Sequence, residues 1–325
     1  MPVSDFSGAV RNISMQPDEL EIEEVIVTNI PIEKTIEKII NTSKARFNKP
    51  IVLNTYYREF VKQNGKYTKF SDGLLDYHTT GTTKKTKTDL IVRESRAARI
   101  AMENEDFDPD SFLDVRERIT RNYDFTYLSA ILLKGKNYKY YDITLKSKKN
   151  AAGKEMYVIG FNPKADVEKP LFSGSVVYDP ASNLIYDIVV ASAQSHMKYA
   201  FTMSLFGFKI SFLEQSMKAS YRMQGNNYVA FYNKASVAIK IFNRRRGLDD
   251  LIESKYDLVV NNYSSGSPYD KSKVYKEKSL YGRGNHYSAP FWKNSNAMVL
   301  TDEEENVIKN LEKESAEAPA PAATN

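Results

Sequence analysis

The sequence contains no cysteine, three histidines and a single tryptophan among its 325 residues. Without cysteine the chain cannot form disulfides, thiolate nucleophiles, Cys-type zinc sites or iron–sulfur clusters. The histidines, His78, His196 and His286, are far apart and form no zinc-protease motif, so they predict no metal site. The chain also lacks the glycine patterns of phosphate- and dinucleotide-binding loops and the GxSxG motif of serine hydrolases. These absences predict a protein that is not an enzyme and that needs no cofactor.

Long apolar runs and a strong excess of one charge are absent as well. The most apolar stretch, Tyr199–Leu213, is too short and too polar to cross a bilayer, so we expect no transmembrane helix. Met1–Leu20 shows neither the basic nor the apolar region of a signal peptide, which predicts a chain that is cytosolic or trimmed at its start. A net charge of +5, from 46 basic and 41 acidic residues, is too small to predict a nucleic-acid partner.

The residues that are abundant are aromatic, with 22 tyrosines and 16 phenylalanines, and aromatic residues favour strands. The sequence opens with short strands in residues 1–28 and an amphipathic helix over 31–47, in which Pro31 occupies the first helical position. Beyond Pro50 the apolar period changes to two. Asn64-Gly65 lies between two such strands and predicts a β-hairpin.

The remainder of the chain is rich in strand patterns. Residues 95–135 are predicted to be helical or irregular, whereas 138–263 contain further strands, one of them over 199–214. The total is about ten to twelve strands with short connections, which is typical of a meandering antiparallel sheet. A helix is expected over 302–315, followed by a flexible Ala- and Pro-rich tail over 316–325.

One apolar stretch is a candidate binding wall. Apolar residues alternate over Phe201, Met203 and Leu205, and a second alternating set is Phe206, Phe208, Ile210 and Phe212. The shift by one residue between the two sets predicts a β-bulge. Two interpretations are open: a concave apolar wall that binds a lipid or a protein segment, with Phe206, Phe208 and Phe212 as binding residues, or the core beneath the helices.

Two further features lie towards the C-terminus. Arg244, Arg245 and Arg246 follow an apolar strand and are candidates to bind phosphate, lipid head groups or lipopolysaccharide, or else form a charged strand end that prevents edge pairing. Phe291 and Trp292 lie between the strand-rich body and the last helix, and we expect them to be a buried structural latch.

Four stretches in this order resemble those of one known family. They are Leu20–Thr28, Tyr56–Phe60 with Lys66 and Tyr67, Met156–Phe161 followed by Phe172–Asp179, and Phe291–Trp292 ahead of the helix near Thr301. The family is the "carboxypeptidase-like regulatory domain-containing protein" group of Bacteroidota, and the resemblance extends over nearly the whole chain. Its first stretch is similar to the last strand of a small regulatory β-sandwich, and the word carboxypeptidase refers to that domain and not to catalysis.

The resemblance implies a fold and a place in the cell. The fold would be of the α+β class but mainly β: a curved antiparallel sheet, similar to the LolA-like half-barrel, with helices packed on it. The family is exported, so the chain would be a non-enzymatic protein of the periplasm or outer membrane, binding a protein partner as an accessory subunit of an outer-membrane assembly. The alternative is a lipid or lipoprotein carrier that uses the apolar concave sheet.

The resemblance also implies a domain layout. Residues 1–28 would be the end of the regulatory β-sandwich with a linker, 29–315 the half-barrel, and 316–325 a disordered tail. A complete sandwich requires roughly 70–90 residues before Thr28. We therefore expect the first part of the sandwich and the export signal to be missing from this sequence; the alternative is that this member has lost the sandwich.

Overall fold

A computed structural model describes residues 22–26, 30–83, 85–99, 114–205, 207–283 and 302–317. Within these residues, all strands belong to one 12-stranded sheet. The strands are β1 (Ile22–Val25), β2 (Ile51–Gln63), β3 (Lys66–Gly81), β4 (Thr86–Arg99), β5 (Tyr141–Lys149), β6 (Glu155–Pro163), β7 (Phe172–Asp179), β8 (Leu184–Ser192), β9 (Thr202–Leu205), β10 (Phe208–Gln224), β11 (Asn227–Asn243) and β12 (Leu248–Ser265).

Helices connect these strands and cover the sheet. The α-helices are α1 (Ile32–Arg46), α2 (Arg118–Tyr123), α3 (Thr126–Leu128) and α5 (Asp302–Glu317). The short helical segments are η3 (Val115–Glu117), the π-helical η4 (Ser129–Leu133), η5 (Lys134–Tyr140), η6 (Gln194–Tyr199), η7 (Arg244–Arg246), η8 (Lys271–Lys273) and η9 (Leu280–Arg283).

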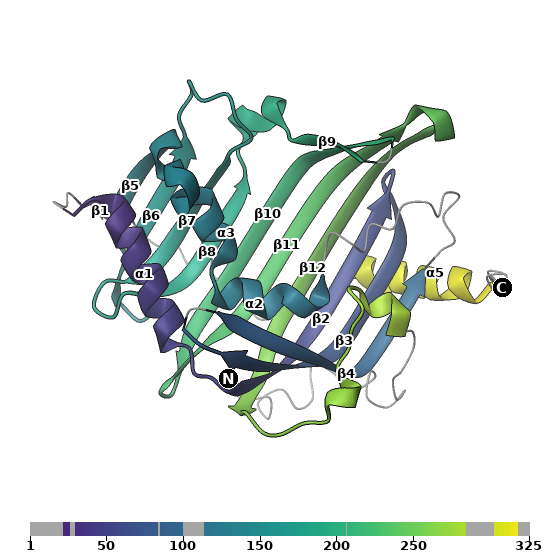
Figure 1. The fold of residues 1–325 in the computed structure, drawn as a ribbon, viewed down its shortest axis with the longest axis horizontal. Coiled ribbons are helices and arrows are strands. Elements are labelled where there is room, and N and C mark those ends of the chain that lie inside the picture. The colour runs from purple at the N-terminus through teal and green to yellow at the C-terminus, as the bar shows by residue number, and fades with distance from the viewer. Residues whose placement is uncertain are drawn as a thin grey trace.

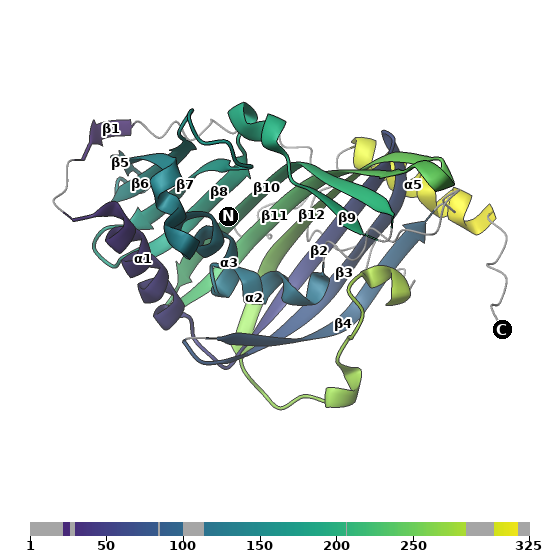
Figure 2. The same cartoon turned by 45° about the horizontal axis from the view of Figure 1, so that its top comes forward.

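The sheet is curved and open (Figures 1 and 2). Its strand order is β1-β5-β6-β7-β8-β10-β11-β12-β2-β3-β4, and β9 pairs with part of β10. All these strands pair antiparallel, and in the described residues the two end strands, β1 and β4, do not pair with each other. The predicted fold class, a mainly β, curved antiparallel sheet with helices packed on it, is confirmed.

The β2–β3 hairpin fixes which residues face each side of the sheet. Asn64 and Gly65 have φ angles of 51° and 79°, as expected where both residues of a two-residue turn need positive φ. Because side chains alternate along a strand, Tyr57 belongs to the main core, whereas Phe60 belongs to a separate cluster with α5. We call the side of Tyr57 the inner face and the side of Phe60 the outer face.

Helix α1 covers the inner face at β8, and α2 and α3 lie on the same face (Figure 1). The predicted helix over 31–47 is confirmed, although it begins at Ile32 and Pro31 is its N-cap. Ile36, Ile39 and Ile40 are buried on one stripe. The hydroxyl of Ser43 accepts a hydrogen bond from the backbone N–H of Ile185 at 3.0 Å, which fixes the helix along the start of β8.

An aromatic cluster joins the ends of α1 and α2 to the sheet. The Phe47 ring stacks on Tyr123 at a centroid distance of 3.9 Å and on Tyr228 at 4.6 Å. All three rings are buried. Aromatic pairs of this kind add about 0.5–1.5 kcal/mol each beyond the burial of their area. The helices of the inner face are therefore fixed to the sheet at this point.

The interpretation of residues 199–214 as one strand with a bulge near Leu205 is wrong. The register shift marks a hairpin: Thr202–Leu205 turns back and pairs with Phe208–Ser211. Gly207 has a φ of 83°, which only glycine adopts readily, and it supplies the turn. The register of the longer strand does shift, but between Phe212 and Glu214, so that Phe212 faces the same side as Met217.

Strand β1 lies in the stretch assigned to the end of a regulatory β-sandwich. Of residues 1–28, the structure describes only 22–26, and Ile22–Val25 pairs with β5 as an end strand of this same sheet. The remaining residues of that stretch lie outside the described residues. Of the predicted tail over 316–325, residues 316 and 317 form the end of α5, and 318–325 lie outside the described residues.

Candidate functional site

A cavity of about 280 Å³ lies on the inner face, between the segment α2–η4 and strands β7, β8, β10 and β11. Figure 1 shows α2 and α3 crossing this part of the sheet. The cavity wall is mainly apolar, with two arginines at its helical side and no acidic residue. It consists of Arg118, Arg121, Tyr127, Ala130, Ile131, Phe172, Val190, Phe212, Gln215, Ser216, Met217, Ala235, Ser236 and Val237.

A second cavity of about 240 Å³ adjoins the first. The two share Phe172, Phe212 and Gln215 in their walls, and the second is otherwise lined mainly by the connection from β8 to β9, including Met197 and Phe201. Phe201 is 55% exposed and packs against Phe212 with the ring centroids 6.0 Å apart. The two cavities therefore adjoin at Phe212, and the second reaches the surface at Phe201. We call the pair of cavities the groove.

Arg118, the first residue of α2, is a buried cation in the wall of the larger cavity. Only 3% of the residue is exposed. Its Nε and Nη2 atoms have no hydrogen-bond partner among the described residues, and the guanidinium lies over the Tyr256 ring at 4.2 Å. Burial acts to lower the pKa of Arg118, but the electrostatic effects of the surrounding tyrosines and of Glu59 are larger. The pKa is therefore raised overall, and the guanidinium stays charged.

Glu59 is a buried carboxylate whose negative charge raises the pKa of Arg118, and each of its oxygens already accepts a hydrogen bond. The donors are the Tyr57 hydroxyl at 2.8 Å and the Ser254 hydroxyl at 3.1 Å. Burial raises the pKa of Tyr256 to about 12 although Arg118 lowers it in part, so this neighbour of Arg118 stays neutral at physiological pH.

Arg121 lies one turn further along α2 and, unlike Arg118, is fully paired. Its Nε and Nη2 donate to Glu117 at 2.9 and 2.6 Å, and its Nη1 donates to the Tyr127 hydroxyl at 3.3 Å. Its side chain is 38% exposed. Arg121 therefore forms the half-exposed rim of the cavity, whereas Arg118 lies inside.

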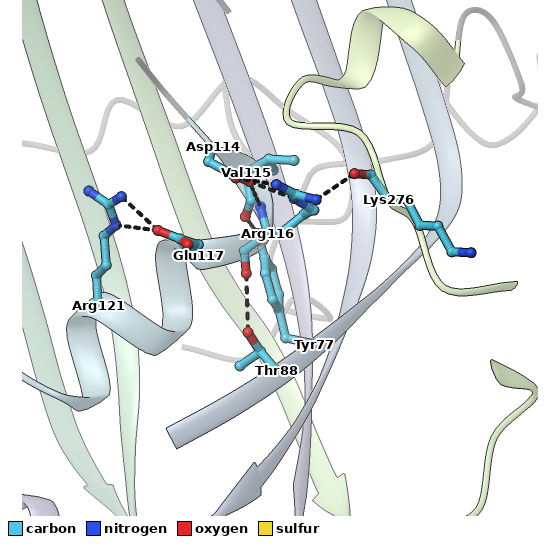
Figure 3. Close-up of polar contacts among 8 residues, drawn as sticks. All are labelled: Tyr77, Thr88, Asp114, Val115, Arg116, Glu117, Arg121 and Lys276. Atoms are coloured by element: carbon cyan, nitrogen blue, oxygen red, sulfur yellow. Dashed lines mark hydrogen bonds and ion pairs between the residues drawn. The ribbon is translucent and has the colours of Figure 1, made fainter. Parts of the chain in front are cut away.

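Hydrogen bonds from β3 and β4 fix the start of α2, as Figure 3 shows. The Tyr77 hydroxyl donates to the carbonyl of Val115 at 2.6 Å, and the Thr88 hydroxyl donates to the carbonyl of Arg116 at 3.1 Å. At the other end of α2, the Tyr221 hydroxyl donates to the carbonyl of Asn122 at 2.9 Å. Because these three donors come from the sheet, Arg118 is held in a fixed position relative to it.

Asp114 and Arg116 brace the same helix start from the solvent side. Arg116 Nε donates to Asp114 Oδ1 at 2.9 Å, and Arg116 Nη1 donates to the carbonyl of Lys276 (Figure 3). Partial burial acts to raise the pKa of Asp114, but the hydrogen bonds from Arg116 outweigh it and hold the pKa below its usual value. Asp114 therefore remains a carboxylate at neutral pH and holds Arg116, whose Nη1 contacts the loop that follows β12 at the carbonyl of Lys276.

Two of the predicted apolar binding residues line the inner face. Phe212 is half-buried and forms part of both cavities. Phe208 is 9% exposed and packs in a cluster with Ile210, Ile239 and Leu248, which is the core interpretation. The sequence therefore predicted one residue of the groove, while the structure places Phe208 beside the groove and not in its wall.

The three predicted basic residues lie away from the cavities. Arg244, Arg245 and Arg246 form the exposed turn η7, which connects β11 to β12. The backbone N–H of Arg246 donates to the Asn243 side chain at 3.2 Å, and its guanidinium lies 5.3 Å from the Phe208 ring. Both flanking strands are paired along their length, so this charged turn protects no strand edge.

The other predicted site residues, Phe206, Phe291 and Trp292, lie outside the described residues. Within the part of the chain that the structure describes, no three His, Asp or Glu side chains come close enough to hold a metal ion. A search of the same residues found no helix with the length and apolar character needed to cross a membrane.

Sequence reasoning missed the helical side of the groove, above all Arg118. The stretch 95–135 gave only a weak helical pattern, because α2, α3 and η4 are short and change helical type. An arginine inside Arg118–Tyr123 has no local signature that separates a buried cation from a solvated one. The available signal was the pair Arg118 and Arg121, whose spacing of three places both on one helix face.

Comparisons with known proteins find matches at low identity among solved structures. No family model and no curated protein match this chain. Among solved structures, a DUF1329 family protein from Desulfovibrio piger aligns with 74% of this chain and 96% of its own, at 9% identity and a TM-score of 0.31. A structure of lipovitellin described by its lipid–protein interactions aligns with 79% of this chain and 29% of its own, at 9% identity and a TM-score of 0.28.

A third solved structure is the outer membrane protein OprD from Pseudomonas aeruginosa. It aligns with 72% of this chain and 66% of its own, at 12% identity and a TM-score of 0.21. At these scores none of the three likenesses supports a conclusion about function. Any function must therefore be argued from the groove itself.

Proposed function

We propose that this protein is a non-enzymatic binding protein that holds an apolar, lipid-class ligand in the groove between α2–η4 and the sheet. The observation that supports this most is the pair of adjoining cavities, of about 280 and 240 Å³, with predominantly apolar walls. Ligand sites are concave, mainly apolar and of roughly 300–1,000 Å³, with a few polar groups that orient the ligand. The groove has this size and this composition.

The alternative interpretation, that this wall is simply core, accounts less well for the same residues. Interiors pack to a density that leaves few voids larger than a water molecule. Ile131, Val190 and Met217 are buried and yet border empty space, while Phe172, Phe212 and Val237 on the same wall are only half-buried. An apolar ligand that covered these side chains would complete the core that the helices leave open.

Ala235 provides a direct test of ligand binding. It lies on β11 opposite Met217 and lines the cavity, so Ala235→Phe should fill the cavity with its own ring. The test is the fluorescence of N-phenyl-1-naphthylamine, a neutral dye that brightens in apolar sites. The wild-type protein should bind the dye, and dodecan-1-ol should displace it. Ala235→Phe should bind the dye about tenfold more weakly, which corresponds to a loss of about 1.4 kcal/mol of binding free energy.

Ala238 supplies the matched control for this test. It lies three residues along the same strand, on the other face, where it lines a separate hollow beside Phe60. Ala238→Phe should bind the dye as wild type does. Equal binding by both variants would contradict the proposed site, and no dye binding by folded wild type would contradict the function.

A second candidate function, an accessory subunit that binds a protein partner, is favoured by a different surface. Phe242 is 39% exposed on β11, directly before the exposed turn Arg244–Arg246. An exposed aromatic beside several arginines has the composition of a binding hot spot. Co-purification from solubilised membranes should then recover a partner with wild type and lose it with Phe242→Ser, whereas the same recovery with both would count against this surface.

The location of the protein follows from the same proposal. We place it in the periplasm or at the outer membrane, as a member of the Bacteroidota family with a carboxypeptidase-like regulatory domain. The support is the sequence resemblance and an apolar groove suited to a membrane-derived ligand. Cell fractionation of the native protein tests this directly, and recovery in the cytosolic fraction alone would contradict it.

A further inference from the structure

The charged group inside the groove determines which lipid-class ligand fits best. Arg118 is buried, and its Nε and Nη2 atoms have no hydrogen-bond partner among the described residues. From these two observations we infer that the ligand is an amphiphile with an anionic head group, carboxylate or phosphate, and that Arg118 binds this head group. This inference rests on the proposed function. It adds the chemistry of the ligand's polar end, which apolar walls alone do not specify.

An arginine that is buried without a partner costs free energy. The guanidinium cannot lose its proton under any physiological condition, so Arg118 brings a full charge into the inner face. Buried charges are normally paired, because desolvating an ion costs several kcal/mol. Arg118 is 3% exposed, its Nε and Nη2 have no hydrogen-bond partner, and its aromatic contact with Tyr256 compensates only in part.

The charged side chains that line the cavity are arginines. Among the described residues, this wall contains two arginines and no aspartate or glutamate. Arg121 is satisfied by Glu117 and Tyr127, so the uncompensated charge belongs to Arg118. A ligand anion is the complementary group, and guanidinium binds both carboxylate and phosphate through two parallel hydrogen bonds.

The charge of Arg118 lies at one side of the apolar wall. Arg118 lies on the helical side, and Phe172 and Phe212 continue the wall into the second cavity, which reaches the surface at Phe201. An amphiphile whose head group lay beside Arg118 would extend its apolar chain past Phe212 and Phe172 toward Phe201. The hydrogen bonds that fix α2 to the sheet hold Arg118 in place before a ligand arrives, which reduces the entropy lost on binding.

The experiment compares ligands that share a chain and differ in the head group. Dodecanoate, dodecyl phosphate and dodecan-1-ol would each compete with N-phenyl-1-naphthylamine for wild type, Arg118→Met and Arg121→Met. Wild type should bind at least one of the anions roughly tenfold to a hundredfold more tightly than the alcohol, since hydrogen bonds to charged groups contribute about 1.5–3 kcal/mol. The tighter of the two anions identifies the head group.

The variants assign the preference to one side chain. Arg118→Met keeps the length of the side chain and removes its charge, so it should abolish the preference for the anion while leaving the affinity for the alcohol within about twofold. Arg121→Met should keep the preference, because the charge of Arg121 is already paired. Circular dichroism of each variant establishes that the fold is retained.

Two results would overturn the inference. Equal affinities of wild type for the three ligands, or an anion preference that survives in Arg118→Met, would mean that Arg118 does not bind a head group, while ligand binding itself would stand. If no ligand displaced the dye and the dye did not bind, the proposed function and this inference would both fall.

Discussion

The arginines on the two faces of the sheet differ in whether acidic side chains pair with them. On the outer face, Arg58 forms ion pairs with Asp257 at 3.3 Å and with Glu304 of α5 at 3.1 Å. Arg96 forms an ion pair with Asp72 at 2.8 Å and a looser one with Glu312 of α5 at 3.5 Å. On the inner face, Arg118 has no such partner within the part of the chain that the structure describes.

The surroundings of these arginines differ in the same way. The outer face is closed by α5, whose Ile308 and Leu311 are buried against Phe60 and Phe70. Figure 2 shows α5 against the β3–β4 end of the sheet, away from α1, α2 and α3. The inner face keeps open cavities beside its arginine. The outer-face arginines hold the fold together through ion pairs, whereas we propose that the charge of Arg118 is paired by a ligand.

The largest expected loss of stability follows from the removal of an ion pair on the outer face. Asp72 is fully buried and accepts hydrogen bonds from Arg96 and from the Tyr56 hydroxyl at 2.9 Å. Asp72→Ala should lower the free energy of unfolding by about 3–5 kcal/mol, because it removes the closest partner of the largely buried Arg96 and leaves only the looser contact with Glu312. Urea unfolding measures this value.

The matched control for this change is on the same strand. Asp76 pairs with Arg93, whose side chain is 45% exposed, so Asp76→Ala should cost about 1 kcal/mol or less. Similar losses for the two variants would remove the distinction between a structural pair on the outer face and an ordinary surface pair.

The next largest loss of stability is expected where α5 packs on the outer face. Leu311→Ala deletes a side chain that is 2% exposed between α5 and the sheet, and should cost about 2–3 kcal/mol. Asn310→Ala on the exposed side of α5 is the control, with little change expected. Dye binding in the inner groove should be normal for both. A Leu311→Ala protein of full stability, or one that loses dye binding, would contradict the assignment of α5 to a purely structural role.

A smaller stability effect is expected for the inner arginine. Arg118→Met should change the free energy of unfolding by less than about 1 kcal/mol in either direction, since replacing a buried charge by an apolar side chain is often neutral or stabilising. Thermal unfolding without added ligand measures this. A loss as large as that of Asp72→Ala would show that Arg118 is a structural residue like Arg58 and Arg96.

The smallest effect is a pH dependence at the base of α2. The pKa of Asp114 is lowered in the folded protein, so its contribution to stability is present above the ordinary value of 3.8 and is lost as the pH falls through the lowered value. Asp114→Asn should therefore melt below wild type at neutral pH. The difference should shrink as the pH falls below 3.8 and through the lowered pKa, and a difference that stays constant over this range would contradict the role given to the Arg116 contact.

The fold was predictable from the sequence where local signals agree with the tertiary structure. Asn64-Gly65 and the isoleucine stripe of α1 predict their elements correctly, because turn chemistry and helical period act within a few residues. The hairpin at Gly207 was misread as a bulge, since a one-residue shift of alternation has both causes and only pairing in space separates them.

The groove could not be predicted in the same way. Its wall combines residues from α2 to β11 whose contacts depend on the curvature of the whole sheet. Phe212 was found because aromatic alternation is a strand signal, but Arg118 has no signal of its own. Whether a buried arginine is paired depends on acidic residues far away in sequence, as the 246-residue separation of Arg58 and Glu304 illustrates.

The central claim is that the inner groove holds a lipid-class ligand with an anionic head group. Native mass spectrometry of the protein, purified without detergent and then incubated with dodecanoate and dodecyl phosphate, tests it most directly. The account predicts a complex of one ligand per chain in wild type that is lost in Ala235→Phe and retained in Ala238→Phe. A folded wild-type protein that gives only its bare mass, before and after incubation with these ligands, would contradict it.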